Sequence, residues 1–437
     1  MTCVTDYHSI PSDSITPDTS QDFSLSSSPD PLSATQSLES LALDALRTLL
    51  GRPDADWTSP EQRQGVLAVL ECQTDILAIM ATGSGKTMLT LIPVILQPNK
   101  TTVVILPLNS LLDDYCRRLD EFSIPYEVFR NQRLQGQANL IIVSADKAIS
   151  SDWKQAISIL RNSREIIRYV FDEGHIPLGA QEYRPLLKKV EALREVFPLQ
   201  LVTLSGSISE AQETVVRHMF CLGSNTLVIR TKTNRPELKF VWLTEVQTSV
   251  LTASVQAVLA AHAFPEDDVK SRALIFVSSK VLGYQLSQAL GFDFYCGGDL
   301  TAPQRIQYHN RWITGEKRVM VCTSAFGVGN DYPHTRLVIH AGSPFEMIGY
   351  IQEVSRAGRD KQSATCVLIP TPRGAPVIPT GEEDFGGKAA MHTALTKRSN
   401  CIRFVLTAHL NRSGTRCSDL SENETCSFCD STAAGPL

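Results

Sequence analysis

The sequence lacks the features of a membrane or secreted protein. It contains no apolar run long enough to cross a bilayer, and its N-terminus has no basic segment followed by an apolar one. Its 11 cysteines mostly stand singly inside apolar runs, as at Cys221, Cys322 and Cys366, and they gather only near the end of the chain. Scattered thiols of this kind are typical of a reducing compartment. We therefore expect a globular intracellular protein.

Lys and Arg are absent from the first 40 positions. Six acidic side chains occur there: Asp6, Asp13, Asp18, Asp22, Asp30 and Glu39. Residues 1–37 are rich in Ser, Thr, Asp and Pro and contain too few apolar anchors to offset their ordering entropy, so we predict a disordered tail. Removing −6 from the net charge of −5 leaves +1 for the remaining residues. A near-neutral body neither requires nor excludes a polyanionic partner.

The rest of the 437-residue chain alternates apolar strands with helical stretches, which indicates an α/β fold with parallel sheets. A first amphipathic helix is expected at 38–50, and a second from Ser59 through Leu70. The expected strands are 76–80, 102–106, 139–143, 167–171, 200–204, 227–230, 239–243, 273–277, 292–295, 318–322, 336–340 and 365–369. A polar linker at 231–237 divides the body. The predicted domains are 38–233 and 234–374, followed by a linker at 375–395 and a small module at 396–437.

The stretch Ile76 to Thr87 has the pattern of a phosphate-binding loop. An apolar strand leads into Thr82-Gly83-Ser84-Gly85, where glycines let backbone amides wrap around an anion, and Lys86-Thr87 opens a helix. Lys86 is expected to reach the β/γ-phosphates of a nucleotide, and the Thr87 hydroxyl to bind Mg²⁺. Met80 replaces the usual first glycine. The alternative is a glycine turn with a surface lysine.

A second strand, ending at Phe171, runs into Asp172-Glu173-Gly174-His175. A phosphate-loop site needs one carboxylate for Mg²⁺ and another to orient or deprotonate the attacking water. We assign Asp172 to the metal and Glu173 to the water. The alternative is a solvated loop.

Together these residues resemble the superfamily 2 helicases, and within them the RecQ family, over nearly everything from Trp57 to Asp430. The match lies in six segments: 80–87 (motif I, which in that family also begins with Met), 107–111 (Ia), 172–175 (II), 204–207 (III), 323–330 (V) and 352–360 (VI). The resemblance implies two tandem RecA-like domains with ATP between them. It also implies that Gln62 contacts adenine, with Trp57 either stacking on the base or belonging to the core.

Further site residues follow from the same resemblance. Arg359 is the expected arginine finger, with Arg356 beside it on the γ-phosphate, because permanently charged guanidiniums suit the charge of a phosphoryl transition state. On their own, such paired arginines would read as surface charges. His175 and Gln352 are assigned to the catalytic set, and Gly329 to the nucleotide site. The expected DNA contacts are Asn109, Ser110, Ser144, Tyr183, Arg184, Ser278, Ser279 and Thr323.

The last cluster comprises Cys401, Cys417, Cys426 and Cys429. A C-x-x-C pair with two further cysteines can complete a tetrahedral Zn²⁺ site, which a short segment poor in large apolar residues would need as a staple. Disulfides are the alternative. The cluster is also similar to the RecQ zinc-binding module.

Two departures from the family bear on function. No tryptophan occurs in 176–185, where the family carries an aromatic-rich loop that senses single-stranded DNA. The sequence runs only eight residues past Cys429, so we expect it to lack the winged-helix domain of many relatives. The main hypothesis is an ATP-, Mg²⁺- and Zn²⁺-dependent 3′–5′ DNA helicase acting on single-stranded and tailed duplex DNA in the nucleus, or otherwise in the cytoplasm. The alternatives are a DNA-dependent ATPase that translocates without unwinding, and a non-hydrolysing DNA-binding scaffold.

Overall fold

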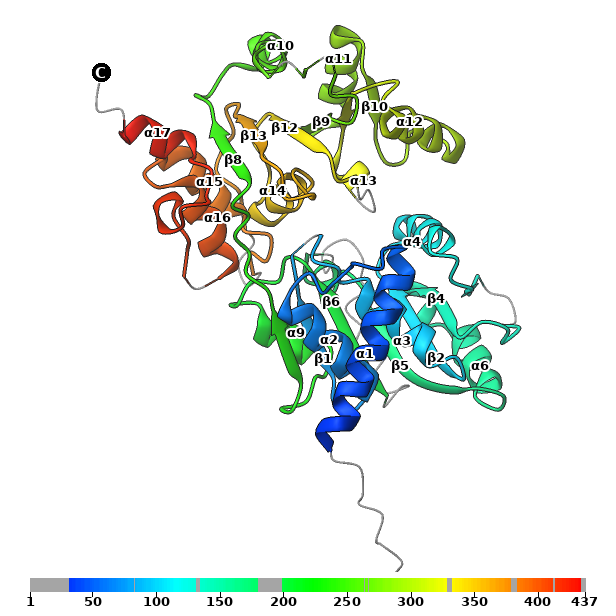
Figure 1. Cartoon of the computed structure of the whole chain (residues 1–437). Coiled ribbons are helices and arrows are strands. Elements are labelled where there is room, and N and C mark those ends of the chain that lie inside the picture. Colours follow the sequence, from blue (N-terminus) through cyan, green and yellow to red (C-terminus); the bar gives the residue numbers. More distant parts are fainter. Residues whose placement is uncertain are drawn as a thin grey trace, which may run out of the picture.

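The computed structural model describes residues 31–81, 83–130, 134–179, 199–262, 264–265, 267–327, 332–378, 383–411 and 413–433. These residues form two parallel sheets covered by helices, with a small group of helices at the C-terminal end beside the second sheet (Figure 1). The expected α/β class with two tandem sheets is confirmed. No helix among the described residues is long and apolar enough to span a membrane.

The first sheet has the order β3-β4-β2-β5-β6-β1-β7, with all pairs parallel. Its strands are β1 Ile76–Ile79, β2 Lys100–Leu106, β3 Glu127–Val128, β4 Leu140–Ser144, β5 Glu165–Phe171, β6 Gln200–Ser205 and β7 Leu227–Arg230. Its helices are α1 Pro31–Leu50, α2 Pro60–Glu71, α3 Met88–Leu96, α4 Asn109–Glu121, α5 Ala145–Ala148, α6 Ser151–Leu160, α7 Ile176–Gly179 and α9 Glu213–Met219.

Alternate residues of the first sheet belong to two separate cores. Ile76 and Ala78 of β1 pack with α1 to α4 on one face, whereas Leu77 and Ile79 pack with α5, α6 and α9 on the other. Both faces of the strand are therefore apolar, which is the pattern of a parallel sheet covered on both sides. A continuous apolar run, rather than an alternating one, was the signal that located these strands.

The second sheet has the order β10-β11-β9-β12-β13-β8 and is also parallel throughout. Its strands are β8 Leu238–Trp242, β9 Arg272–Val277, β10 Asp293–Tyr295, β11 Val319–Cys322, β12 Thr335–Ala341 and β13 Ala364–Ile369. Its helical segments are η2 Thr248–Val250, α10 Leu251–Ala261, α11 Lys280–Leu290, α12 Ala302–Thr314, α13 Ser324–Gly327 and α14 Met347–Val354.

All twelve expected strands are confirmed, and β3 was missed because two residues carry no periodic signal. The predicted disordered tail at 1–37 is wrong at its end, since α1 begins at Pro31 rather than at residue 38. Extending a formed helix costs little, and proline is well tolerated in the first turn, where its missing N–H has no intrahelical partner to lose. Residues 1–30 lie outside the described part.

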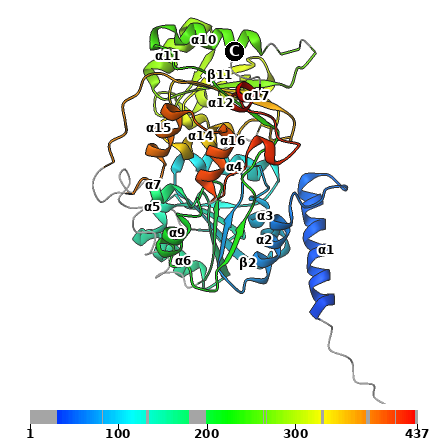
Figure 2. The ribbon, with the colours of Figure 1, turned by 90° about the vertical axis from the view of Figure 1, so that its left-hand side faces the viewer.

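The C-terminal elements are α15 Lys388–Lys397, α16 Ile402–Leu410, η3 Cys417–Asp419 and α17 Ser427–Ala433. Helices α15 and α16 lie beside α14 (Figure 2), and α17 lies beside β8. The stretch expected as a linker, 375–395, thus contains most of α15.

Helix α16 also reaches the first domain, because the Glu210 backbone N–H donates to the Leu410 carbonyl at 3.0 Å. The C-terminal helices therefore contact both halves of the body.

The buried Arg403 fixes α16 to the segment that joins the two sheets. Its guanidinium donates to Asn234 Oδ1 at 2.9 Å and to the carbonyl oxygens of Arg235 at 2.6 Å, Leu238 at 2.7 Å and Glu424 at 2.9 Å. Only 1% of Arg403 is exposed, so these bonds form away from water, where an unmade hydrogen bond is costly.

Candidate nucleotide-binding cleft and cysteine site

The turn after β1 is built by two glycines in left-handed conformations, Gly83 with φ +82° and Gly85 with φ +78°. A side chain at Gly85 would also clash, because an added Cβ would lie 2.1 Å from Gln62 Nε2. The turn is thus closed around its own backbone, as a phosphate-binding loop requires. Thr82, which belongs to this loop, lies outside the described residues.

Lys86 folds back over the loop. Its Nζ donates to the carbonyl oxygens of Met80 at 2.8 Å and Ala81 at 3.2 Å. Burial lowers the pKa of Lys86, and the carboxylates of Glu173 and Asp172 oppose that shift. The two carboxylates that follow β5 are therefore electrostatic neighbours of the loop lysine, although about 90 residues separate them in sequence.

Asp172 and Glu173 lie in a turn directly after β5. Asp172 Oδ1 accepts from the Glu173 backbone N–H at 2.9 Å, and Glu173 takes a left-handed conformation with φ +51°. Burial, and then the neighbouring Glu173, raise the pKa of Asp172 to about 6, whereas Arg118 and Lys86 lower it. A buried carboxylate of this kind gains most from a cation beside it.

His175 joins two segments of the first domain to the second domain. Its Nδ1 lies 3.0 Å from Ser205 Oγ and 3.3 Å from Glu173 Oε2, and its Nε2 lies 2.7 Å from Gln352 Nε2. Since an amide nitrogen can only donate, Nε2 is the accepting nitrogen and Nδ1 carries the proton. Burial, reinforced by Lys86, lowers the pKa of His175 to about 4.

Gln352 of α14 connects the two domains. Besides its bond to His175, its Nε2 donates to Ser207 Oγ at 2.7 Å. Both acceptors belong to the first domain, 145 and 177 residues earlier in the chain. One side chain of the second domain thus touches both the turn after β5 and the turn after β6.

These residues line one cleft between the two domains, with a volume of about 340 Å³. Arg356 and Arg359 of the second domain enter it opposite the phosphate loop. Burial, and then Arg359, lower the pKa of Arg356 to about 9. The predicted site residues that share this cleft are Gly83, Gly85, Lys86, Thr87, Asp172, Glu173, His175, Gln352, Arg356 and Arg359.

The donor set of the cleft fits a hard divalent cation. The Thr87 hydroxyl and the Asp172 carboxylate line the same cavity, and oxygen ligands of this type are those that Mg²⁺ prefers. A cation bound there would also favour the charged form of Asp172, which burial disfavours.

Of the two residues expected near the adenine, Gln62 lies against the loop and Trp57 against the core. Gln62 is 1% exposed and uses its amide within the protein, accepting from the Thr58 N–H at 2.8 Å and donating to the Gly85 carbonyl at 3.2 Å. Trp57 packs against the first core of the sheet, in agreement with the core alternative. As placed here, Gln62 supports the loop, and its contact with a base stays a prediction.

The cleft also contains residues that the sequence did not single out. Tyr115 and Arg118 of α4 line it, as does Phe122. Arg118 pairs with Asp114 at 3.3 Å and lowers the pKa of Asp172. On an amphipathic helix an arginine reads as a surface charge, so no local signal could have placed Arg118 at the cleft.

The expected DNA contacts of the second domain lie at one edge of its sheet. Ser278 and Ser279 are exposed after β9, and the half-buried Thr323 follows β11. In the first domain Ser144 ends β4 directly before α5 and is only 2% exposed, so its side chain is not open to a phosphate in this structure. Asn109 and Ser110 open α4, but their side chains, like Tyr183, Arg184 and Gly329 as a whole, lie outside the described part.

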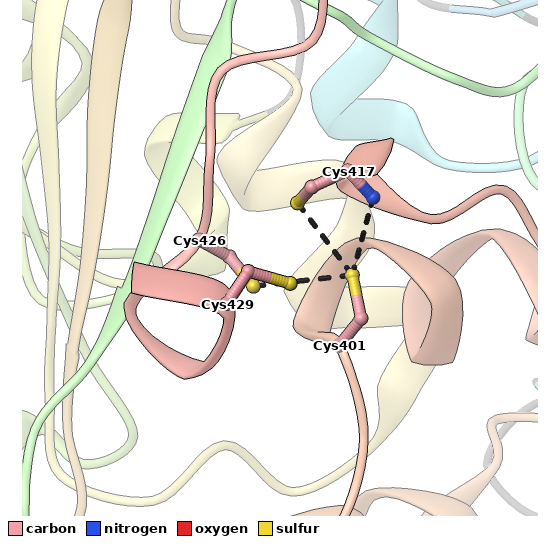
Figure 3. Close-up of side chains that lie close together, drawn as sticks. All are labelled: Cys401, Cys417, Cys426 and Cys429. Atoms are coloured by element: carbon pink, nitrogen blue, oxygen red, sulfur yellow. Dashed lines mark hydrogen bonds between the residues drawn. The ribbon is translucent and has the colours of Figure 1, made fainter. Parts of the chain in front are cut away.

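Four cysteine side chains converge at the C-terminal end (Figure 3). Cys401 Sγ lies 3.5 Å from Cys417 Sγ and 3.9 Å from Cys426 Sγ, and all four sulfurs, including that of Cys429, lie within 4.8 Å of one another. A disulfide needs about 2.05 Å, so the disulfide alternative is wrong for these four free thiols. A tetrahedral ion with bonds of about 2.3 Å would separate its sulfurs by about 3.8 Å, which matches this cluster.

The DEAD/DEAH box helicase family matches residues 59–215, and the helicase conserved C-terminal domain matches residues 254–361. The ATP-dependent DNA helicase RecQ of Synechocystis sp. is 27% identical over 84% of this chain and 77% of its own length. The ATP-dependent helicase SGS1 of Saccharomyces cerevisiae is also 27% identical, over 81% of this chain but only 24% of its own length.

A similar fold occurs in the structure of S. cerevisiae Dbp5 bound to RNA and ADP BeF3. It has a TM-score of 0.61 and 16% identity and covers 77% of this chain and 90% of that one.

Two parallel sheets that enclose a phosphate loop, two carboxylates and two arginines define a nucleic-acid helicase core of superfamily 2. With the relatives above, the chain is a helicase similar to the RecQ ATP-dependent DNA helicases, although it spans only about a quarter of the length of several of them. The family implies that the cleft uses ATP with Mg²⁺ and that the partner is nucleic acid.

Proposed function

We propose that the chain couples ATP hydrolysis in the inter-domain cleft to 3′–5′ movement along single-stranded DNA and to separation of tailed duplexes. The polarity and the tailed substrate come from the family. The cleft supports the coupling, because residues from both domains meet across it. The helicase would act in the nucleus, where duplex DNA is available in a eukaryotic cell. The proposed domains are those expected from the sequence, 38–233, 234–374 and 396–437, with the start of α1 from Pro31 added to the first and the start of α15 from Lys388 added to the last.

The cleft residues divide the chemistry between the two domains. Lys86 holds the β/γ-phosphates, while Thr87 and Asp172 hold Mg²⁺, which neutralises the charge that develops on the phosphates. Glu173 orients the attacking water and accepts its proton. Arg359 and Arg356 stabilise the transition state from the second domain, which they can do only when the cleft is closed.

The single observation that carries this proposal is the bridge formed by Gln352. Its amide contacts His175, three residues after the metal carboxylate, and Ser207, in the turn after β6. A displacement of Asp172 or Glu173 on hydrolysis would therefore reach α14 of the second domain through the contact between His175 and Gln352. Closure on ATP and opening after hydrolysis would move the two halves of a DNA track relative to each other.

The proposed DNA track uses hydroxyls and backbone amides more than basic patches. Ser278, Ser279 and Thr323 stand at the carboxyl edge of the second sheet, where an extended strand can pass. Such contacts are compatible with a body that is almost neutral outside its acidic N-terminus.

The cysteine cluster is proposed to hold one structural Zn²⁺ through Cys401, Cys417, Cys426 and Cys429. The ion would staple the start of α16 to η3 and α17, and so would stabilise the short C-terminal module. We expect metal analysis of the purified chain to find about one zinc per chain, by the four-thiolate rule. A folded C-terminal module without metal would contradict the site.

The decisive experiment measures ATP turnover with and without single-stranded DNA, together with unwinding of 3′- and 5′-tailed duplexes. Lys86→Ala should abolish turnover, because no other described residue of the cleft extends an ammonium from the phosphate loop. Lys100→Ala is the matched control, since Lys100 is 44% exposed and pairs only with the surface carboxylate of Glu165 among the described residues. Undiminished turnover in Lys86→Ala would refute the phosphate-loop assignment.

A DNA-dependent ATPase that translocates without unwinding is the second candidate. The observation in its favour is the absence of tryptophan from 176–185, where the family places its DNA-sensing loop. Turnover that DNA stimulates, with no strand separation on either tailed duplex, would favour this candidate. DNA binding without any turnover would instead favour a scaffold, which the complete set of cleft residues argues against.

A further inference from the structure

An exposed aromatic side chain stands next to the expected DNA track. Phe345, in the loop between β12 and α14, is 60% exposed, and the guanidinium of Arg373 lies 3.5 Å from the centre of its ring. Single exposed apolar residues are common on proteins and need no explanation. Val377, 88% exposed, is such a residue. Phe345 differs because a cation is stacked on one face of its ring.

Backbone hydrogen bonds hold Arg373, the cationic member of the pair, in place. Arg373 donates to the Ser343 carbonyl at 2.6 Å. Ser343 Oγ donates to the Thr371 carbonyl at 2.7 Å and accepts from the Thr371 N–H at 3.1 Å. These bonds tie the loop after β12 to the loop after β13. The guanidinium therefore keeps its place over the ring, and little side-chain freedom remains to be lost when a ligand binds.

The pair also occupies the edge of the sheet at which a nucleic acid is expected. Strands β11, β9, β12 and β13 are neighbours and parallel, so their carboxyl ends lie side by side. Hydroxyl-bearing residues follow these ends in the same order: Thr323, Ser278, Ser343 and Thr371. Phe345 and Arg373 stand two residues beyond the last two of this row.

We propose that Phe345 and Arg373 form a stacking platform for one base of single-stranded DNA. This proposal rests on the proposed function. The open face of the phenyl ring receives the base, and the guanidinium on the other face strengthens the stack through its charge. The platform does not distinguish between DNA sequences, because every base has an aromatic face that can stack. Ser278, Thr323 and Thr371 would hold the DNA backbone, whereas the buried Ser343 only ties the two loops together, and the platform would fix the position of the DNA strand along this row.

The test is binding of the full chain to fluorescent oligodeoxythymidylate, and to an abasic strand of the same length, by anisotropy. Phe345→Ala should weaken binding of the normal strand by about 5- to 150-fold, equivalent to about 1–3 kcal/mol per stacked base. Binding of the abasic strand should change little. Phe345→Leu keeps an apolar side chain over Arg373 and should lose as much affinity as Phe345→Ala, whereas Phe345→Trp should retain it. Val377→Ala is the matched exposed control.

The outcomes separate the platform from the proposed function. Wild-type protein that binds neither strand would refute both. Wild-type protein that binds both strands equally well, or a Phe345→Ala variant that loses both to the same extent, would refute the platform alone. Thermal unfolding of each variant shows whether a loss of affinity reflects a loss of fold, and Phe345→Leu decides the matter if Phe345→Ala unfolds.

Discussion

Removing the amide of Gln352 tests how the two domains communicate. Gln352→Ala deletes two hydrogen bonds of 2.7 Å, one to His175 and one to Ser207. Each such bond contributes about 0.5–1.5 kcal/mol net, so the closed arrangement should lose about 1–3 kcal/mol, or about 5- to 150-fold in population. The loss should fall on kcat. The KM for ATP should change little, because the phosphate loop belongs wholly to the first domain.

The assay is DNA-stimulated ATP turnover over a range of ATP concentrations, with Gln307→Ala as the control on the exposed face of α12. A double-mutant cycle with Ser207→Ala isolates one of the two bonds. We expect a coupling of about 0.5–1.5 kcal/mol between Gln352 and Ser207. Additive effects within about 0.3 kcal/mol would show that the bond does not contribute to turnover, and the bridge would then lose its mechanistic role.

Two predictions concern stability. The pKa of His175 is lowered from 6.5 to about 4, so its contribution to stability is complete above about pH 6.5 and is lost as the pH falls through about 4. The loss in the free energy of unfolding, measured with urea across this pH range, should reach about 3 kcal/mol. His175→Asn cannot titrate, so it should remove this pH dependence. If the variant keeps the same pH dependence as the wild type, a buried neutral imidazole is refuted. Arg403→Met should lower the free energy of unfolding by about 3–5 kcal/mol, because the carbonyls of Arg235 and Leu238 lose a buried charged donor. Arg416→Met, at an exposed position, should lower it by less than about 1 kcal/mol. Equal losses in thermal unfolding would contradict this prediction.

The sequence predicted the elements that have a strong local pattern. Continuous apolar runs located all twelve longer strands, because a strand covered on both faces needs no polar alternation. The glycines of the loop after β1 predicted left-handed backbone conformations, which only glycine adopts readily. The structure has these conformations at Gly83 and Gly85. The early start of α1 at Pro31 escaped prediction, because the Ser- and Pro-rich composition before it reads as disorder.

The sequence by itself thus determined the strands, the phosphate loop and the set of residues able to bind a nucleotide and a metal. Only the tertiary structure decided which of them meet. It placed Gln352 against His175 across 177 residues, brought Arg118 to the cleft from a helix surface, and put Gln62 under the loop instead of facing outward. The reason is physical. Propensity and periodicity depend on a few neighbouring residues. The packing of two domains brings together side chains that are far apart in the sequence, and no local sequence pattern indicates which of them will meet.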